Sequence, residues 1–533
     1  MLFEERTQHF REWLTEKDVN VSTKIKIDDL RDVGQGRSVI ATEDISEDEE
    51  LFSIPRSALL NVDSCSLIKD RPETGEILAD MTQWEALILV FMYEWKIKAN
   101  NLPWRAYFDV LPVNDKSYES NQLIFWSKAE LELLSPSYIV QRVGHDSASA
   151  MYDRLVPFFE KFVGDVTKDE FHLIASVIMA YSFDVTNGDA ISSDEEESDE
   201  EDSHHETKSS EKSGSDEHEH EHEHEHDPGK TEEAELTSDN KIEESEKEEL
   251  VKNSESLKSM VPLADTLNAD TRKHNASLFI TADRLVMRSI KPILKNEQIY
   301  NIYSEHPNSE ILRRYGYVEQ LGSAHDFAEI SLETFKKYFA ENSSLSKVTI
   351  DEILAILREI EDEEDEKFIL DTYDCFASGE VIFELTFLTQ LFVIIAAINH
   401  KKSFNSASSE VKARAIRRVY KKSYQLLEAR KLTAQFIKDF PNILKIRLSE
   451  YPRKAMSGLQ PAKDKPLTRL EMAMVVLASE CLSLQNCMDT EKVFIKSEQS
   501  FNIIDDEKLL RNIMKKDTFE GTETQPAKKK RLS

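Results

Sequence analysis

The spacing of apolar positions changes twice within the first hundred residues, from a helical period to a strand period and back. Residues 1–20 place apolar side chains at helical intervals between charged ones, which predicts a short amphipathic helix. Apolar segments at 38–42 and 50–54 follow, separated by an acidic turn and closed by Pro55, which predicts two strands joined as a hairpin. We therefore expect residues 1–80 to form a helix followed by a small β-rich unit.

The segment 41–54, ATEDISEDEELFSI, has a second copy at 289–302, SIKPILKNEQIYNI. Glu49 corresponds to Glu297, and the apolar positions keep their type. The matched apolar pairs are Ile45 with Ile293, Leu51 with Ile299, Phe52 with Tyr300, and Ile54 with Ile302. Neither copy alone could bury the face of a sheet. Two related units so far apart in sequence therefore predict one β domain whose halves are separated by insertions.

Helical periodicity fills part of the interval between the two copies and returns after the second one. Apolar residues recur at i, i+3, i+4 and i+7 in three segments, which predicts an inserted helical subdomain over 81–183; the segments are 84–97, 149–163 and 168–183. Beyond residue 330, helical segments continue, and we expect an all-α domain over 331–500. Residues 501–533 are expected to be a polar tail.

The most apolar run of the chain lies in that second helical region, at 383–399. It contains Glu384 and Gln390, and it is shorter than the roughly 20 residues that a bilayer requires. We interpret it as a buried core helix and expect no membrane segment.

The segment 184–258 differs from the rest in composition. Residues 189–259 contain 28 Asp and Glu against 7 Lys, a net charge of −21 within a total of −34. Like charges repel and almost no apolar residue is present, so we expect a disordered acidic insert. Its alternating His–Glu run is interpreted as a solvated tract rather than a metal site. The remaining 462 residues carry only −13, which argues against direct binding to nucleic acid.

Cysteine usage and the chain ends add three expectations. The four cysteines include no CxxC pair, which predicts no structural zinc and a reducing compartment. The first 20 residues are charged throughout and lack the apolar stretch of a signal peptide. At the other end, PAKKKRLS (526–533) is a candidate nuclear-import signal, so we expect a nuclear protein.

Three short elements are candidates for chemistry. GQG (34–36) precedes the first strand, and glycines there let the backbone approach a ligand closely. ADTLNADTRKHNA (264–276) follows the acidic insert and precedes a strand, and its amides offer both donors and acceptors to a ligand. YGY (315–317) follows Tyr303 by twelve residues. Each alone suits an ordinary turn or a core aromatic, so the information lies in their order along the chain.

That order resembles the SET-domain protein lysine methyltransferases, in the branch typified by the Rubisco large-subunit methyltransferase. PWRAYFDVLP (103–112), FWSKAELELL (125–134) and IMAYSFDV (178–185) are also similar to segments of this branch, so the resemblance covers about 20–500. It implies an α+β fold: a split, β-rich SET domain with an inserted helical subdomain, and an all-α C-terminal substrate-binding domain. The second SET half, 259–330, would carry the active site.

The resemblance also implies the reaction, transfer of a methyl group from S-adenosyl-L-methionine to a neutral lysine amine. This chemistry requires a cofactor pocket, a narrow channel and an oriented amine, but no metal. By the same resemblance, seven residues would contact the cofactor: Gly34, Gln35, Gly36, Asp265, Asn268, Ala269 and Tyr315.

Three tyrosines are implied on the lysine side of the site. Tyr315 matches the family's catalytic tyrosine, Tyr303 would act with it and close the lysine channel, and Tyr181 would face the substrate lysine. Aromatic walls desolvate the amine, which lowers the pKa of the lysine, and their faces attract a cation as it arrives. His274 and Asn275 are expected to support the fold.

One departure from the family pattern leaves an alternative open. The family's Asn-His pair is Asn268-Ala269 in this chain. If the histidine contributes only its backbone, alanine changes little. If its ring packs on the cofactor, alanine would weaken binding, and the protein could instead be a degenerate binding module or an acidic chaperone for basic nuclear proteins.

The partner expected from the resemblance is a basic protein. The chain is most similar to fungal members of the branch, which implies monomethylation of a lysine in a large-subunit (60S) ribosomal protein, number 42 in the yeast naming. The acidic insert would steer such a substrate by its charge. We expect the protein to act as a monomer.

Overall fold

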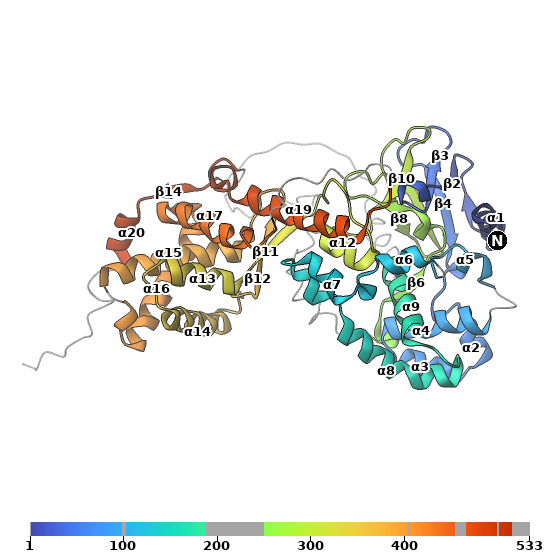
Figure 1. Cartoon of the computed structure of the whole chain (residues 1–533), viewed down its shortest axis with the longest axis horizontal. Helices are drawn as coiled ribbons and strands as arrows, with labels where there is room; N and C mark the ends of the chain where they lie inside the picture. Colours follow the sequence, from blue (N-terminus) through green and yellow to red (C-terminus); the bar gives the residue numbers. More distant parts are fainter. Residues whose placement is uncertain are drawn as a thin grey trace, which may run out of the picture.

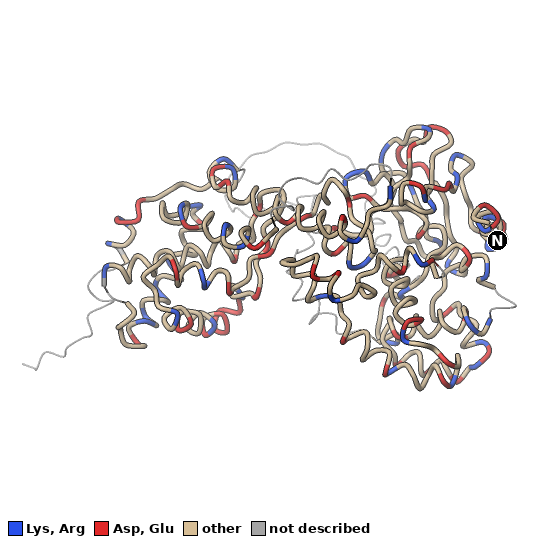
Figure 2. Tube along the Cα trace, viewed as in Figure 1, with Lys and Arg blue, Asp and Glu red and all other residues tan. Residues whose placement is uncertain are grey.

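The computed structural model has two lobes joined along a shared helix (Figure 1). The residues that it describes are 2–98, 103–113, 115–187, 250–402, 404–452, 465–497 and 500–513. One lobe contains the two four-stranded sheets and an inserted group of helices, and the other is mainly helical (Figure 1). Acidic and basic residues are interspersed over both lobes (Figure 2).

The first lobe is built on two four-stranded sheets, with strand orders β1-β4-β9-β8 and β2-β3-β10-β7. Helix α1 (Phe3–Glu16) precedes them, as predicted, and buries Phe10, Trp13 and Leu14. The strands are β1 (Asn20–Val21), β2 (Ile25–Asp29), β3 (Arg37–Ala41), β4 (Glu50–Pro55), β7 (Asn268–Ala269), β8 (Ala276–Ile280), β9 (Arg284–Ser289) and β10 (Gln298–Asn301).

The two sequence copies pair with each other, which confirms a single β domain made from separated halves. Glu50 on β4 pairs with Arg288 on β9, and Gln298 on β10 pairs with Ile40 on β3. Gln298 is the position matched to Glu50, and Arg288 the position matched to Ile40. If each residue is replaced by its match in the other copy, the pair Glu50–Arg288 becomes the pair Gln298–Ile40. The matched Ile45 and Ile293 also bridge each other, so the halves are related by an approximate two-fold axis.

The predicted hairpin within each copy is wrong. Strands β3 and β4 lie in different sheets, as do β9 and β10. The connection 42–49 is longer than a tight hairpin loop, and at Ile45 it pairs with the other copy instead of turning back. It thereby carries the chain from one sheet to the next.

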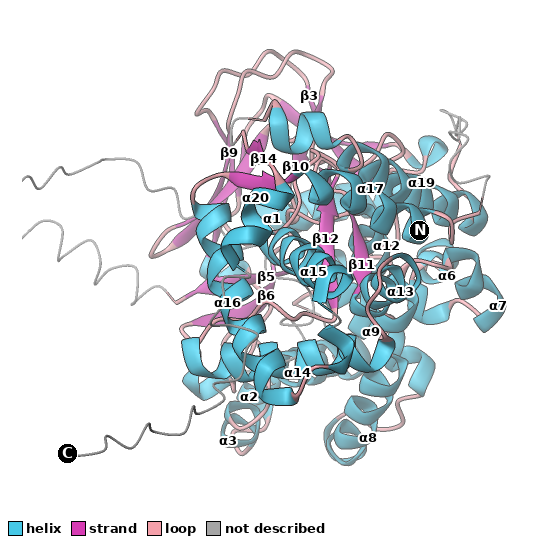
Figure 3. Ribbon diagram, turned by 90° about the vertical axis from the view of Figure 1, so that its left-hand side faces the viewer, coloured by secondary structure: helices cyan, strands magenta, loops and turns pink. Residues whose placement is uncertain are grey.

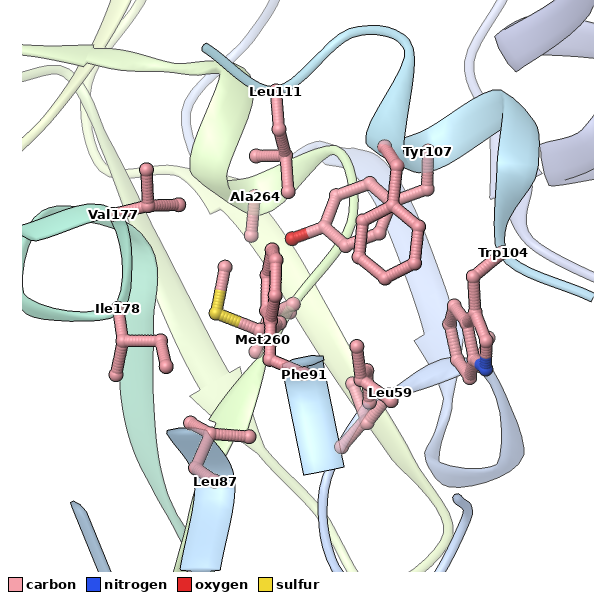
Figure 4. Close-up of a cluster of buried hydrophobic side chains, with 14 of the residues drawn as sticks. Leu59, Leu87, Phe91, Trp104, Tyr107, Leu111, Val177, Ile178, Met260 and Ala264 are labelled. Carbon is pink, nitrogen blue, oxygen red and sulfur yellow. The ribbon is translucent and has the colours of Figure 1, made fainter. Parts of the chain in front are cut away.

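The helical insertion begins after β4. Its helices are α2 (Ser66–Asp70), α3 (Thr74–Ala79), α4 (Gln83–Met92), α5 (Arg105–Phe108), α6 (Lys116–Asn121), α7 (Lys128–Leu131), α8 (His145–Phe162) and α9 (Lys168–Tyr181). Capping boxes start α4 at Thr82 and α9 at Thr167. Figure 4 shows part of the core, where side chains of α4, α5 and α9 pack together with Met260, the last residue of the strand Ser256–Met260. The labelled residues of the three helices include Phe91, Tyr107 and Val177. The three predicted helical segments are confirmed.

The predicted disorder over 184–258 is wrong at both ends of that range. Strand β5 (Ser182–Thr186) pairs with β6 (Ser256–Met260) in an antiparallel ladder. Val185 and Leu257 are buried in it. The apolar residues at the two edges of the acidic segment therefore form a two-stranded sheet with each other. The rest of the acidic insert, 188–249, lies outside the described residues.

The second lobe contains the predicted helices and faces the viewer in Figure 3. They are α13 (Leu332–Asn342), α14 (Lys347–Glu364), α15 (Phe383–Lys402), α16 (Ser409–Glu428) and α17 (Ala434–Leu448). α15 is apolar and long enough to cross a membrane, but it lies in the core of this lobe, which confirms a buried core helix.

Two features of this lobe were not predicted. Short ladders join β11 (Phe327–Ser331) to β12 (Thr372–Phe376), and β13 (Lys431–Thr433) to β14 (Asn502–Ile504). The polar tail predicted from residue 501 is wrong for its first part, because β14 is followed by α20 (Asp506–Ile513), which buries three apolar side chains: Leu509, Leu510 and Ile513. A short segment with few apolar residues gives too weak a periodicity to be recognised without the lobe it packs on.

Helix α19 (Arg469–Cys487) belongs to both lobes. Its first half packs Met472 and Val476 against Leu123 and Trp126 of the insertion, and its second half contributes to the core of the second lobe. At the junction, the carboxylate of Glu480 accepts hydrogen bonds from Ser137 Oγ at 2.5 Å and from the Tyr451 hydroxyl at 2.6 Å. The predicted boundary near 331 therefore misses a shared interface.

Candidate active site

The candidate cofactor loop and the asparagine loop meet at one side chain. Nδ2 of Asn268 donates hydrogen bonds to the carbonyl of Gln35 at 3.0 Å and to Oγ of Ser38 at 2.8 Å. Asn268 is held in place because β7 pairs in parallel with β10, where it lies opposite Tyr300. The fold thus brings together two elements that are far apart in the sequence.

Both glycines of the first element have backbone conformations that favour glycine. Gly34 has φ +79° and Gly36 has φ +60°. A Cβ atom on Gly34 would lie 3.2 Å from Cα of Pro466, so the space beside Gly34 is already filled by protein. A Cβ on Gly36 would meet nothing within 4 Å. Space for a ligand is therefore beside Gly36 rather than beside Gly34.

The tyrosines of the second element form an aromatic wall. The rings of Tyr303 and Tyr315 are 4.8 Å apart between centroids, and those of Tyr315 and Tyr317 are 6.3 Å apart. The Tyr303 hydroxyl donates to the carbonyl of Leu267 at 2.7 Å. Because Leu267 directly precedes Asn268, one short segment fixes both the aromatic wall and the cofactor loop.

Tyr315 ends helix α12 (Asn308–Tyr315), and Gly316 caps that helix in the left-handed conformation with φ +72°. A Cβ on Gly316 would lie 2.3 Å from Nε2 of Gln122, which is 1% exposed. The turn after Tyr315 is therefore packed directly against the insertion. The hydroxyl of Tyr317, a residue to which the sequence pattern assigns no role of its own, donates to the carbonyl of Ala269 at 3.5 Å.

Tyr181 lies at the end of α9, half-buried, with its ring 6.1 Å from that of Tyr118. Burial, followed by the negative charge of Asp265, raises the pKa of the Tyr181 phenol. Burial also raises the pKa of the Tyr303 and Tyr315 phenols. At neutral pH these hydroxyls stay protonated, so they can orient and donate but do not act as bases.

Asp265, which we predict to contact the cofactor, also makes a side-chain contact that the sequence does not suggest. Its buried carboxylate accepts a hydrogen bond from the hydroxyl of Tyr107 on α5. Tyr107 lies within PWRAYFDVLP, but nothing in the sequence pairs it with Asp265. Burial raises the pKa of Asp265 to about 7. Asp265 therefore links the active-site loop to the insertion.

Replacing Asp265 by Asn should make the stability of the protein less dependent on pH. The folded-state pKa lies above the ordinary 3.8. The free energy of folding that the protonated carboxyl contributes is thus complete below pH 3.8 and is lost as the pH rises through about 7, by on the order of 4 kcal/mol. Asn still accepts from Tyr107 but does not ionise.

The measurement is urea unfolding of both proteins at several pH values between 4 and 8. The free energy of unfolding of the variant minus that of the wild type should increase with pH, since contributions from other groups cancel in the difference. A difference that stays constant over this range would show that Asp265 is ionised in the folded state.

Ala269 contributes its backbone to the site. It pairs with Asn301 on β10, and its carbonyl faces the Tyr317 hydroxyl. Asn275 supports the fold, as expected, because its amide donates to Gln298 O at 3.0 Å and accepts from Tyr300 N at 2.8 Å. His274 contacts the Thr271 carbonyl through Nδ1 at 3.2 Å.

Two hollows in the second lobe lie away from these residues. One of about 590 Å³ is lined by residues of α14 and α16, and one of about 350 Å³ by residues of α15, α17 and α20. Neither is lined by a residue of the candidate site. The site is therefore identified by its converging loops and aromatic side chains.

Comparison with known proteins identifies the family. No family model matches the chain. Ribosomal lysine N-methyltransferase 4 of Saccharomyces cerevisiae is 36% identical over 532 residues, 96% of each protein. The N-lysine methyltransferase SETD6 of Rattus norvegicus is 24% identical over 385 residues, covering 70% of this chain and 64% of the rat protein. The chain belongs to the SET-domain protein lysine methyltransferases. This methyltransferase is therefore an enzyme, a protein-lysine N-methyltransferase.

Solved structures agree with the fold of this SET-domain methyltransferase. Rubisco LSMT bound to AdoMet covers 96% of both chains with a TM-score of 0.53 at 16% identity. The SET domain of LSMT bound to lysine and AdoHcy covers 92% of this chain and 91% of its own, also with a TM-score of 0.53. The split, α+β SET architecture expected from the sequence is confirmed.

Proposed function

We propose that this methyltransferase transfers one methyl group from S-adenosyl-L-methionine to a lysine of a large-subunit ribosomal protein. The ribosomal substrate is suggested by the name of the yeast relative. The observation that carries the proposal is the double anchoring of residues 267–268, which ties the cofactor loop and the aromatic wall together.

The residues present fit the cofactor. Open space lies beside Gly36, and the half-buried Asn268 amide is fixed at its edge. Gln35, Gly36, Asn268 and the Ala269 backbone would hold the cofactor, which when bound supplies an electrophilic methyl group. Asp265 would support this loop from behind through Tyr107 rather than contact the cofactor.

The tyrosines prepare the amine. The wall of Tyr303, Tyr315 and Tyr317, together with Tyr181, would exclude water from the lysine side chain and lower the pKa of its ammonium, so that more of it is neutral. The Tyr315 hydroxyl would orient the amine lone pair toward the methyl group. Phenols with raised pKa values suit this role because they remain uncharged donors.

The direct test is methylation of ribosomal proteins isolated from cells that lack this enzyme. Incubation with purified enzyme and S-adenosyl-L-methionine should increase the intact mass of one large-subunit protein by a single methyl group. We expect that protein to be number 42 in the yeast naming. Modification of a different protein would reject this substrate, and no transfer to any protein would reject the activity on ribosomal proteins.

The acidic insert should accelerate capture of the basic substrate. Its net charge would attract such a protein over a distance set by ionic strength. Deleting residues 190–248 keeps β5 and β6 intact. We expect kcat/KM for the protein substrate to fall by roughly tenfold at low salt and to change little at high salt.

The matched control replaces the same residues with an uncharged Gly/Ser linker of equal length, which should behave like the deletion. Both variants should methylate a short lysine peptide at the wild-type rate. Wild-type kcat/KM of the deletion at low salt would show that the insert has no steering role.

We also propose that the enzyme acts in the nucleus. The support is the basic run KKKR at 528–531, which lies outside the described residues. The position of a fluorescent fusion, with and without these four basic side chains, is the direct test.

A further inference from the structure

Arg37 follows the cofactor loop, and within the described part of the chain it forms no ion pair. Its half-buried guanidinium donates from Nε to Oγ1 of Thr7 at 3.2 Å and from an Nη atom to the carbonyl of Val110 at 3.0 Å. Its Cζ lies 4.1 Å from the centroid of the Phe3 ring. Among the described residues, no carboxylate lies within salt-bridge distance of it.

Arg31 provides an internal comparison, since it stacks on the same Phe3 ring at 4.3 Å. Arg31 is exposed and forms two hydrogen bonds to the carboxylate of Asp29, at 2.9 and 2.6 Å. That bonding raises the pKa of Arg31, whereas burial, followed by repulsion from Arg6 and Arg31, lowers the pKa of Arg37 to about 10. Asp29 lies opposite Arg37 in the β2–β3 ladder and its charge partly offsets this lowering, but the hydrogen bonds of its carboxylate go to Arg31.

A partly desolvated guanidinium without a counter-charge is unfavourable, and such groups are normally paired. Arg37 lies on β3 directly after Gly36, and its side chain points away from that of Ser38, toward α1 and Val110. The Tyr181 phenol is near enough to be among the groups that affect the pKa of Arg37. The positive charge of Arg37 thus lies beside Phe3 and Val110, on the residue that directly follows the cofactor loop.

We propose that Arg37 binds the carboxylate of the methionine part of S-adenosyl-L-methionine. This assignment rests on the proposed function. A guanidinium matches a carboxylate in shape and charge and makes short, charge-assisted hydrogen bonds to it. Fixing the carboxylate at one end of the methionine part restricts where its sulfonium lies, and hence where the methyl group points.

The competing explanation is structural. In that case Arg37 only joins α1 to Val110, and its loss would weaken every ligand of the pocket equally. The two explanations are separated by ligands that differ in the carboxylate. S-adenosylhomocysteine contains the amino-acid part, and 5′-methylthioadenosine keeps the nucleoside and thioether without it.

The experiment is calorimetric titration of the full-length protein with both ligands. Arg37→Gln should weaken binding of S-adenosylhomocysteine by about 10- to 100-fold, the value of a hydrogen-bonded charge. It should leave the affinity for 5′-methylthioadenosine within about twofold of the wild type. Arg31→Gln is the matched control and should change neither affinity. Arg37→Lys keeps the charge but loses the planar fork, so it should give an intermediate loss for the first ligand only.

Equal losses for the two ligands, or no loss for S-adenosylhomocysteine, would overturn the assignment of Arg37. If the Gln variant does not fold, equal losses for the two ligands in Arg37→Lys, or no loss for S-adenosylhomocysteine, would overturn the assignment. Failure of the wild-type protein to bind either ligand would instead overturn the proposed function, so the two failures are distinguishable.

Discussion

Replacing Tyr315 by Phe should lower kcat for methyl transfer by about 100-fold or more, comparable to the loss of a preorganised hydrogen-bond donor in other active sites. The ring and its contacts with Tyr303 and Tyr317 would remain. Only the hydroxyl that we assign to orienting the amine is removed. The measurement is the rate of radiolabelled methyl transfer to ribosomal protein at saturating concentrations of both substrates.

The control is Tyr338→Phe in the second lobe. Its hydroxyl donates to Asp439 at 2.9 Å, so that variant also loses one hydrogen bond, but away from the site. It should retain wild-type kcat and lose about 1 kcal/mol of stability. Binding of S-adenosylhomocysteine to Tyr315→Phe should stay within about an order of magnitude of the wild type. Wild-type kcat in Tyr315→Phe would remove Tyr315 from the catalytic role.

Replacing Gly316 by Ala should destabilise the protein by about 2–4 kcal/mol and greatly reduce activity. The left-handed backbone of Gly316 disfavours any Cβ, and this Cβ would overlap the buried amide of Gln122. Relief of the overlap requires Gln122 or the turn to move, and the turn holds Tyr315. Urea unfolding and kcat measured on the same preparation test both effects.

Gly144 is a matched control for the backbone contribution. It has φ +84° and ψ 23°, close to the φ +72° and ψ 23° of Gly316, but a Cβ there would meet nothing within 4 Å. Gly144→Ala should therefore lower the free energy of unfolding only by the cost of placing a residue with a Cβ in the left-handed conformation, about 1–2 kcal/mol. Adding Gln122→Ala to Gly316→Ala should recover part of the stability. Equal losses in the two single variants would mean that the Gln122 contact is unimportant.

The local elements of the chain were largely predictable because they depend on residues close in sequence. Apolar periodicity located α4, α9 and the helices of the second lobe. The repeated segment, with Ile45 matched to Ile293, predicted one β domain from two halves, and the pairing of those halves confirms it. The elements that were not predicted are short ones, such as β5 and α20. Their few apolar residues show no clear periodicity and become buried only against distant parts of the chain.

The candidate site was predictable in type but not in geometry. The resemblance supplied Gly36, Asn268 and Tyr315 as a set. It did not indicate that Asn268 reaches Gln35 while the neighbouring Leu267 holds Tyr303. These contacts are side-chain hydrogen bonds between distant segments, and sequence spacing does not encode their direction.

The sequence by itself determined the family, the helical and strand segments, and the residue types that the chemistry requires, because these follow from local periodicity and from a recognisable order of motifs. Only the tertiary structure decided how the two β copies exchange partners, that the Asp265 carboxylate is buried against Tyr107, and that Arg37 lacks the carboxylate which Arg31 has. Each of these depends on burial and on pairing between distant segments, which are properties of the folded chain.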